Sequence, residues 1–315
     1  MGRYILKRLL TLIPVLIGIT IFAFLLGVLS PGDPARVALS SKEVEEDITE
    51  EMLEAQRHEM GLDRPFFIQY FDWLEDVLHG DLGESLIDKK DIAECFRLRF
   101  PVTIQLAIFS TIITFTIGVA LGILMAIFHG KWLDHILNFF STLSMSLPSF
   151  WIALLLMTIF SETLHWLDTS GYEGFQSLIM PAIVLSVGAI GSNARLARAT
   201  FLKERGQQYV LVANSKGLRQ RTITVIHILK NSLLPVITMS GTRFAGILGG
   251  SAVIESIFSL PGIGGYTLTA IRNRDYFVVQ AFVLYMGVIY VLMNLVIDII
   301  YFLMNPKIKL KDEKR

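Results

Sequence analysis

The sequence predicts an all-α integral membrane protein with six transmembrane helices, a helical extracellular segment after the first helix, and a cytoplasmic loop of two short helices between the fourth and fifth. The 315-residue chain is 53% hydrophobic and only 18% charged, whereas a soluble domain carries about a quarter charged residues. The charge deficit is concentrated in six apolar windows, each long enough for a helix of about 20 residues to cross a bilayer. Lys and Arg gather in alternate connections between the windows, as they do in cytoplasmic loops.

The six predicted spans cover residues 9–30, 102–128, 135–161, 176–198, 232–255 and 277–304. None of these windows alternates in polarity as a transmembrane β-strand does. We interpret the first window as a retained anchor, because its apolar run exceeds the roughly 7–15 residues of a signal sequence. Two glycine pairs, Gly118 with Gly122 and Gly246 with Gly250, are expected to let helices approach closely.

The distribution of charge orients the chain. If residues 1–8 are cytoplasmic, the inner segments hold most of the basic residues, including those of the loop 199–231 and the tail 306–315. Acidic residues outnumber basic ones in the segment 31–100. Because basic residues mark cytoplasmic loops, both termini are predicted in the cytoplasm of a multi-pass protein of the cell (plasma or inner) membrane, in contact with lipid. The segment 31–100 is predicted outside, and residues 101–305 form the membrane core.

The outer segment has the composition of helices. The stretch EVEEDITEEMLEAQRHEMGL places Ile48, Met52, Leu53 and Met60 near helical spacing. The stretch PFFIQYFDWLEDVLHG then begins with proline and ends in glycine, as a second helix should. Two interpretations stay open: a solvated covering, or a docking surface or lid.

The loop 199–231 is polar and basic between two apolar spans. Its stretch GQQYVLVANSKG predicts a short helix, and helical spacing puts Tyr209, Val212, Ala213 and Lys216 on one face. Gly217 follows as a left-handed cap that ends this helix, and LRQRTITVIHILKN restarts a helix toward the membrane. We expect the small side chain of Ala213 to let a partner approach. An amphipathic connector at the lipid surface is the alternative.

This loop resembles the coupling loop of permeases of binding-protein-dependent ABC importers, in the branch for dipeptides, oligopeptides and nickel. The general motif has Glu and Ala where this chain has Leu211 and Val212. Stretches such as RYILKRLLTLIPVL, PGDPA, GDLGES, LPSFWIALLL and ESIFSLPGIGGYTLTAIRNRDYFVVQAF extend the resemblance over the whole chain. The residues predicted to take part in ATPase coupling are Tyr209 and Val212, from the helical face, and Ala213, Lys216, Gly217, Leu218, His227 and Asn231, which match the motif of this branch.

The resemblance implies a permease subunit that forms half of the pathway for nickel, free or chelated, or for short peptides. The stretches GDPA, SNARLARA and GQQYV are somewhat more similar to nickel permeases. The implied partners are a second homologous permease chain, two cytoplasmic ATPase subunits and an extracellular solute-binding protein. The chain has no Gly-x-x-x-x-Gly-Lys-Ser/Thr loop, so ATP and Mg are expected on the partner ATPases. The chain itself is expected to be non-catalytic and to hold no cofactor.

Four further residues are candidates for the pathway or its gate: Arg243 within the fifth span, Glu255 at its outer end, and Gly262 and Gly264 in the turn-rich stretch that follows. Ionisable groups at bilayer depth are costly and therefore default to functional candidates. No histidine spacing suggests a metal site, the single Cys95 excludes a disulfide within the chain, and no nucleic-acid partner is expected. The alternative from another class, a stand-alone secondary transporter or channel, would require an inverted repeat that the sequence does not show.

Overall fold

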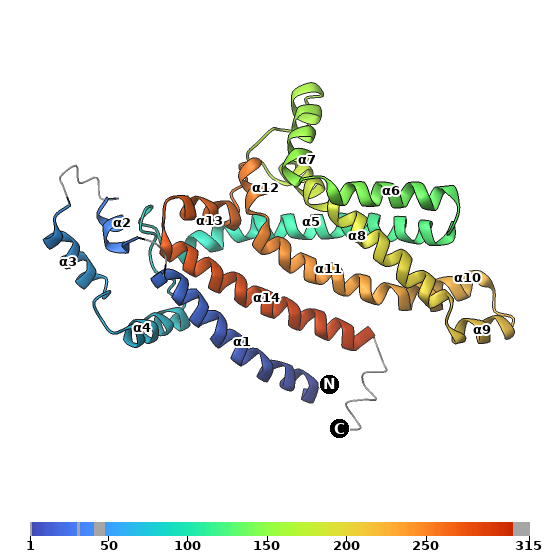
Figure 1. Cartoon of the computed structure of the whole chain (residues 1–315), viewed down its shortest axis with the longest axis horizontal. Helices are drawn as coiled ribbons and strands as arrows, with labels where there is room; N and C mark the ends of the chain where they lie inside the picture. Colours follow the sequence, from blue (N-terminus) through green and yellow to red (C-terminus); the bar gives the residue numbers. More distant parts are fainter. Residues whose placement is uncertain (1, 30–31, 41–47, 305–315) are drawn as a thin grey trace. The chain divides into compact units, whose positions relative to one another are not determined.

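A computed structural model of the chain describes residues 2–29, 32–40 and 48–304. Apart from turns and an isolated bridge between Glu84 and Asp91, these residues form helices (Figure 1). In chain order the elements are α1 (Gly2–Leu29), α2 (Pro34–Ser40), α3 (Glu50–Glu59), α4 (Phe66–His79), α5 (Ile92–Ile127), α6 (Trp132–Ser146), α7 (Ser149–Leu156), the π-helix η1 (Met157–Thr163), the 3-10 helix η2 (Phe175–Leu178), α8 (Ile179–Arg205), α9 (Gln208–Ser215), α10 (Gln220–Thr222), the π-helix η3 (Ile223–Leu229), α11 (Lys230–Gly250), α12 (Ala252–Ile257), α13 (Ile263–Arg272) and α14 (Tyr276–Met304).

Among the described residues, five helical stretches are long and apolar enough to cross a membrane: Leu10–Leu29, Ile92–Ile127, Phe175–Arg205, Gln220–Gly250 and Tyr276–Ile300. A sixth span requires the pair formed by α6 and the helix Ser149–Thr163, which is bent by 99°. The prediction of six spans is confirmed when this bent pair counts as one, and the bend falls within the predicted span 135–161. Proline disfavours helical backbone in the residue before it, and Leu147, which precedes Pro148, is extended (φ −77°, ψ 128°).

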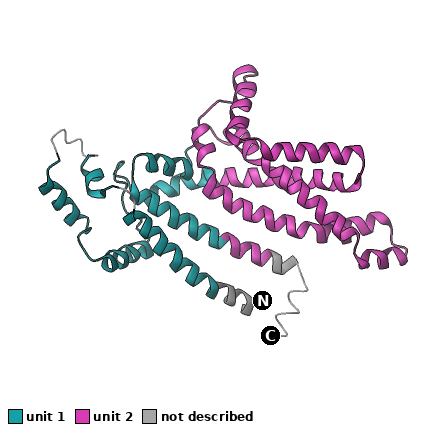
Figure 2. Cartoon of the chain, in the orientation of Figure 1, with its two compact units in different colours: residues 1–103, 261–292 teal, residues 104–260, 293–315 magenta. Residues whose placement is uncertain are grey.

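The chain forms two compact units (Figure 2). The first comprises Met1–Thr103 and Pro261–Leu292, and the second comprises Ile104–Leu260 and Met293–Arg315. From the sequence we predicted an outer segment that ends at residue 100 and a single core after it. The inclusion of residues 261–292 in the first unit was not predicted. The reason is packing between residues far apart in the sequence, which local patterns do not reveal.

The first unit is held together by an apolar cluster and a buried carboxylate. Ile92 and Phe96 of α5 pack with Ile263, Ala270, Val278 and Ala281 from α13 and α14. The carboxylate of Asp275, 2% exposed, accepts a hydrogen bond of 2.6 Å from the Ser85 hydroxyl. Because a buried carboxylate is costly unless it is hydrogen-bonded, this contact fixes the loop before α5 against the turn between α13 and α14.

The second unit contains one close helix crossing that the sequence predicted. A β-carbon added at Gly122 of α5 would lie 2.5 Å from the carbonyl oxygen of Ala194 and 2.6 Å from the Ala197 side chain of α8. The same addition at Gly118 would lie 2.8 Å from the β-carbon of Asn193. The expected close approach at this pair is confirmed. The second pair differs, since Gly246 and Gly250 have no neighbouring atom within 4 Å of an added β-carbon.

Candidate functional site

The loop between α8 and α11 forms a compact hairpin of short helices. α8 ends at Arg205, α9 runs over Gln208–Ser215, and the chain then reverses at Gly217, whose φ of +71° lies in the left-handed region. The Gly217 N–H donates to the carbonyl of Asn214 at 2.9 Å, and the Leu218 N–H donates to that of Ala213 at 3.3 Å. Glycine adopts positive φ without the steric cost of a β-carbon, so the predicted glycine cap has the expected geometry.

The inward face of α9 is anchored by an apolar cluster within the second unit. Val210 and Ala213 pack with Ile223 and Ile228 of η3, together with Ala126 and Phe201. Ala213 is only 8% exposed. The expectation that Ala213 offers a contact surface to a partner is therefore wrong for this conformation: its small side chain lets α9 approach η3 instead.

Tyr209 ties α9 to the helices on both sides of it. Its hydroxyl donates to the Glu204 carboxylate of α8 at 2.9 Å and accepts from the Asn231 amide of α11 at 3.4 Å. Burial raises the pKa of Tyr209, and the adjacent Glu204 carboxylate adds to this shift. The structure thus brings together Tyr209 and Asn231, with the backbone carbonyl of His227 at 3.5 Å from the same hydroxyl. Tyr209 and His227 are partly buried whereas Asn231 is exposed, and a coupling role for these three residues stays a prediction.

The outward side of the loop carries exposed apolar side chains, which we call the tip residues: Leu211, Val212 and Leu218. Their side chains are 65%, 53% and 42% exposed, respectively. The predicted face of Tyr209, Val212, Ala213 and Lys216 therefore divides, since Tyr209 and Ala213 turn inward while Val212 and Lys216 are exposed. Sequence reasoning missed Leu211. A helical wheel places Leu211 opposite the Val210–Ala213 face, because successive residues rotate by about 100°, but it does not tell which of these faces meets the rest of the chain.

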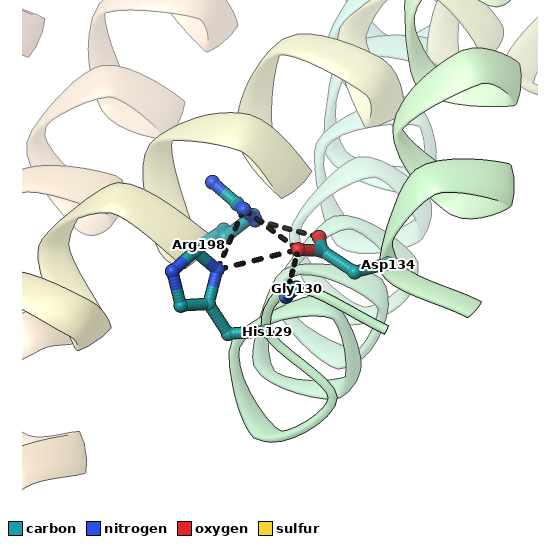
Figure 3. A network of polar contacts seen from close by, with 4 residues as sticks. All are labelled: His129, Gly130, Asp134 and Arg198. Carbon is teal, nitrogen blue, oxygen red and sulfur yellow. Dashed lines mark hydrogen bonds and ion pairs between the residues drawn. The ribbon is translucent and has the colours of Figure 1, made fainter. Parts of the chain in front are cut away.

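A buried ion pair lies where α8 meets the turn between α5 and α6 (Figure 3). Arg198 donates to both oxygens of Asp134, each at 2.7 Å, and the Gly130 N–H donates to the same carboxylate at 3.0 Å. The Asp134 side chain is 3% exposed and that of Arg198 is 27% exposed. The Nδ1 atom of His129 lies 3.3 Å from the Asp134 carboxylate and 2.9 Å from the Arg198 guanidinium. Nothing in the sequence pattern singled out this group, because its members are separated by up to 69 positions.

The four pathway candidates are distributed over both compact units. Arg243 of α11 donates to the Ser192 hydroxyl of α8 at 2.8 Å. Glu255 is fully buried, and its carboxylate accepts a hydrogen bond of 2.7 Å from the Ser251 hydroxyl. Gly262 and Gly264 begin α13 in the other unit. A pathway role for these residues stays a prediction. Within the described ranges, no three His, Cys, Asp or Glu side chains come together as they would around a metal ion.

Taken together, these helices define a multi-pass α-helical membrane protein in which a short helix, anchored on one face, connects two spans. Residues 1–107 and 118–310 match the N-terminal and main family descriptions of binding-protein-dependent transport system inner membrane components. The chain belongs to this family.

Relatives in the family carry peptide transport names. The chain is 37% identical over 317 residues to a protein of Brucella abortus (strain 2308) provisionally named a peptide transport system permease, covering 98% of this chain and 99% of the relative. It is 36% identical over 311 residues to the glutathione transport system permease protein of Salmonella choleraesuis (strain SC-B67), covering 99% of this chain and all (100%) of the relative.

The fold is similar to a solved structure of the inward-facing MetNI methionine ABC transporter. The TM-score is 0.55 with 16% identity, over 67% of this chain and 96% of that chain. At this identity the similarity supports the fold alone. The chain is thus a permease component of an ABC importer by family and by fold.

Proposed function

We propose that the chain forms half of the translocation pathway of an ATP-driven importer and receives work from an ATPase subunit through the loop 199–231. The observation that carries this proposal is the division of α9 into two faces. Val210 and Ala213 fix the helix to its own chain, while Leu211 and Val212 leave their apolar side chains exposed. Adjoining apolar side chains that stay exposed on an anchored helix fit a contact with another protein.

The proposed assembly contains this chain, a second homologous permease chain, two ATPase subunits that bind ATP and Mg, and a solute-binding protein outside the membrane. In this arrangement both termini and the loop 199–231 lie in the cytoplasm. The positive-inside rule supports this orientation, since Lys216, Arg219, Arg221 and Lys230 all belong to the loop. When the ATPase subunits move, the hydrogen bonds of Tyr209 to Glu204 and Asn231 would carry the displacement into α8 and α11 together.

The test replaces Val212 with aspartate in the complete complex. A charge at this position would have to be desolvated on docking, so we expect loss of ATPase subunits on co-purification and loss of solute-stimulated ATP hydrolysis. The matched control is Asn214→Asp, which adds the same charge to the same helix and keeps the oxygen that accepts from Gln220 at 2.7 Å. Unchanged co-purification in V212D, or solute uptake by this chain without ATPase subunits, would contradict the proposal. The second outcome would favour a stand-alone secondary transporter.

We further propose that the transported solute is a short peptide. The support is the peptide and glutathione names of the relatives described above. Nickel, free or chelated, is the alternative from the sequence stretches GDPA, SNARLARA and GQQYV. Uptake of radiolabelled tripeptide and of radioactive nickel by cells with and without this chain separates the two. Loss of nickel uptake with unchanged peptide uptake would overturn the peptide proposal and leave the coupling proposal intact.

A further inference from the structure

Helix α4 has one strongly apolar face that its own chain leaves exposed. The side chains of Phe67, Phe71 and Leu78 are 73%, 62% and 77% exposed. At 3.6 residues per turn these three positions fall within about 40° of arc on the helix surface. Such a stripe is unfavourable in water, because large contiguous apolar patches are rare on soluble surfaces.

Helix α4 lies beside the C-terminal part of the first span (Figure 1). The Phe24 ring of α1 packs against the rings of Phe66, Tyr70 and Trp73, with centroid distances of 5.2, 5.4 and 5.6 Å. The hydroxyls of Thr20 and Tyr70 are hydrogen-bonded at 2.9 Å. These contacts use a different side of α4 from the exposed stripe.

The contact with Thr20 places α4 beside the apolar stretch Leu10–Leu29 of α1. α1 ends at Leu29, and the distance from Thr20 to that end is about 13 Å at 1.5 Å per residue. A hydrocarbon core is about 30 Å thick. α4 therefore lies alongside a part of α1 that is within the bilayer or its interface, where lipid surrounds any side chain that protein does not cover.

The face of α4 opposite the stripe is polar. Gln69, Asp72 and Asp76 line a pocket of about 710 Å³ together with residues of α1, α2, α3 and the start of α14. Arg64 pairs with Asp72 at 3.0 Å, and Arg57 of α3 pairs with Asp33 at 2.6 Å on the same pocket. α4 thus separates a polar pocket from an apolar surrounding.

We propose that α4 is an interfacial helix. Its face formed by Phe67, Phe71 and Leu78 inserts among the acyl chains of the leaflet at the C-terminal end of α1, and its Asp72–Asp76 face borders the polar pocket. Amphipathic helices with aromatic residues on the apolar face occupy the plane of the membrane interface, and Tyr and Trp concentrate at that depth. This inference depends on neither the solute nor the ATPase contact.

The test places nitroxide spin labels on the two faces. The chain has one cysteine, Cys95, so Cys95→Ser gives a background for the single-cysteine variants Phe71→Cys and Asp76→Cys in the complete complex in phosphatidylcholine–phosphatidylglycerol vesicles. Oxygen concentrates in the acyl chains, while a nickel chelate stays in water. We expect the ratio of oxygen to nickel-chelate accessibility to be several-fold higher at position 71 than at position 76.

Two results would overturn the inference. A ratio at position 71 as low as that at position 76 would mean that the stripe faces water. Inaccessibility of the position 71 label to both reagents would mean that another protein covers it. If Cys95→Ser does not fold, Cys95 is retained and the signal of the labelled parent is subtracted, since this residue is only 7% exposed. Phe67→Cys then serves as a second probe of the same face.

Discussion

Replacing Arg198 with alanine removes both guanidinium contacts of a carboxylate that is 3% exposed. Removing one partner of a buried ion pair costs about 3–5 kcal/mol. We expect about 3 kcal/mol here, the lower end of that range, because the Gly130 N–H still donates to Asp134 and the cavity left by Arg198 can admit water. The reverse change, Asp134→Ala, is milder. The freed guanidinium is already 27% exposed and can reach water, so the loss is about 2 kcal/mol, within the range for hydrogen bonds to a charged group.

The assay is a double-mutant cycle on the free energy of unfolding in mixed micelles, titrated with a denaturing detergent. The four proteins are the parent, R198A, D134A and the double variant, with Arg205→Ala as a control at an exposed position of the same helix. The double variant should cost less than the sum of the single ones, with a coupling of about 2 kcal/mol. If R198A and D134A cost the same free energy of unfolding, and the double variant costs their sum, then the buried Asp134 carboxylate does not depend on Arg198.

Two further predictions concern glycines. Gly217→Pro is expected to uncouple ATP hydrolysis from uptake. Proline requires φ near −65°, whereas Gly217 has a φ of +71°, and proline lacks the N–H that donates to the Asn214 carbonyl. Full stimulation of ATPase activity by the loaded solute-binding protein in this variant would count against the loop assignment. Gly122→Val should destabilise the chain by about 1–3 kcal/mol through overpacking, since its β-carbon would meet the backbone of α8 at 2.5 Å. Gly246→Val is the control, because Gly246 has open space around it, and it should change the free energy of unfolding far less in the same titration. Equal losses of stability in Gly122→Val and Gly246→Val would argue against the α5–α8 contact.

The sequence predicts the features that depend on composition and local backbone chemistry. Runs of apolar residues identify the spans, and the steric freedom of glycine predicts the reversal at Gly217. The direction in which α9 faces could not be predicted, because a helical wheel gives the angles between residues but not which side meets the rest of the chain. Ala213 was therefore assigned to the outside although it packs on Ile223 and Ile228.

Contacts over long sequence separations account for the other differences. Asp275 and Ser85 are 190 positions apart, and Asp134 and Arg198 are 64 apart. No periodicity links such residues, so neither the division into two units nor the buried ion pair has a sequence signal. The bend after Leu147 is an intermediate case: Pro148 indicates a break, but the 99° angle depends on tertiary packing.

Photo-crosslinking from α9 tests whether the exposed side of this helix contacts an ATPase subunit. A benzophenone amino acid replaces Val212, which is 53% exposed, and a second variant carries it at Trp166, which is 69% exposed in a loop predicted on the opposite side of the membrane. We expect the Val212 variant to crosslink to an ATPase subunit and the Trp166 variant not to do so. Crosslinking of Val212 to the solute-binding protein, or to lipid alone, would contradict it.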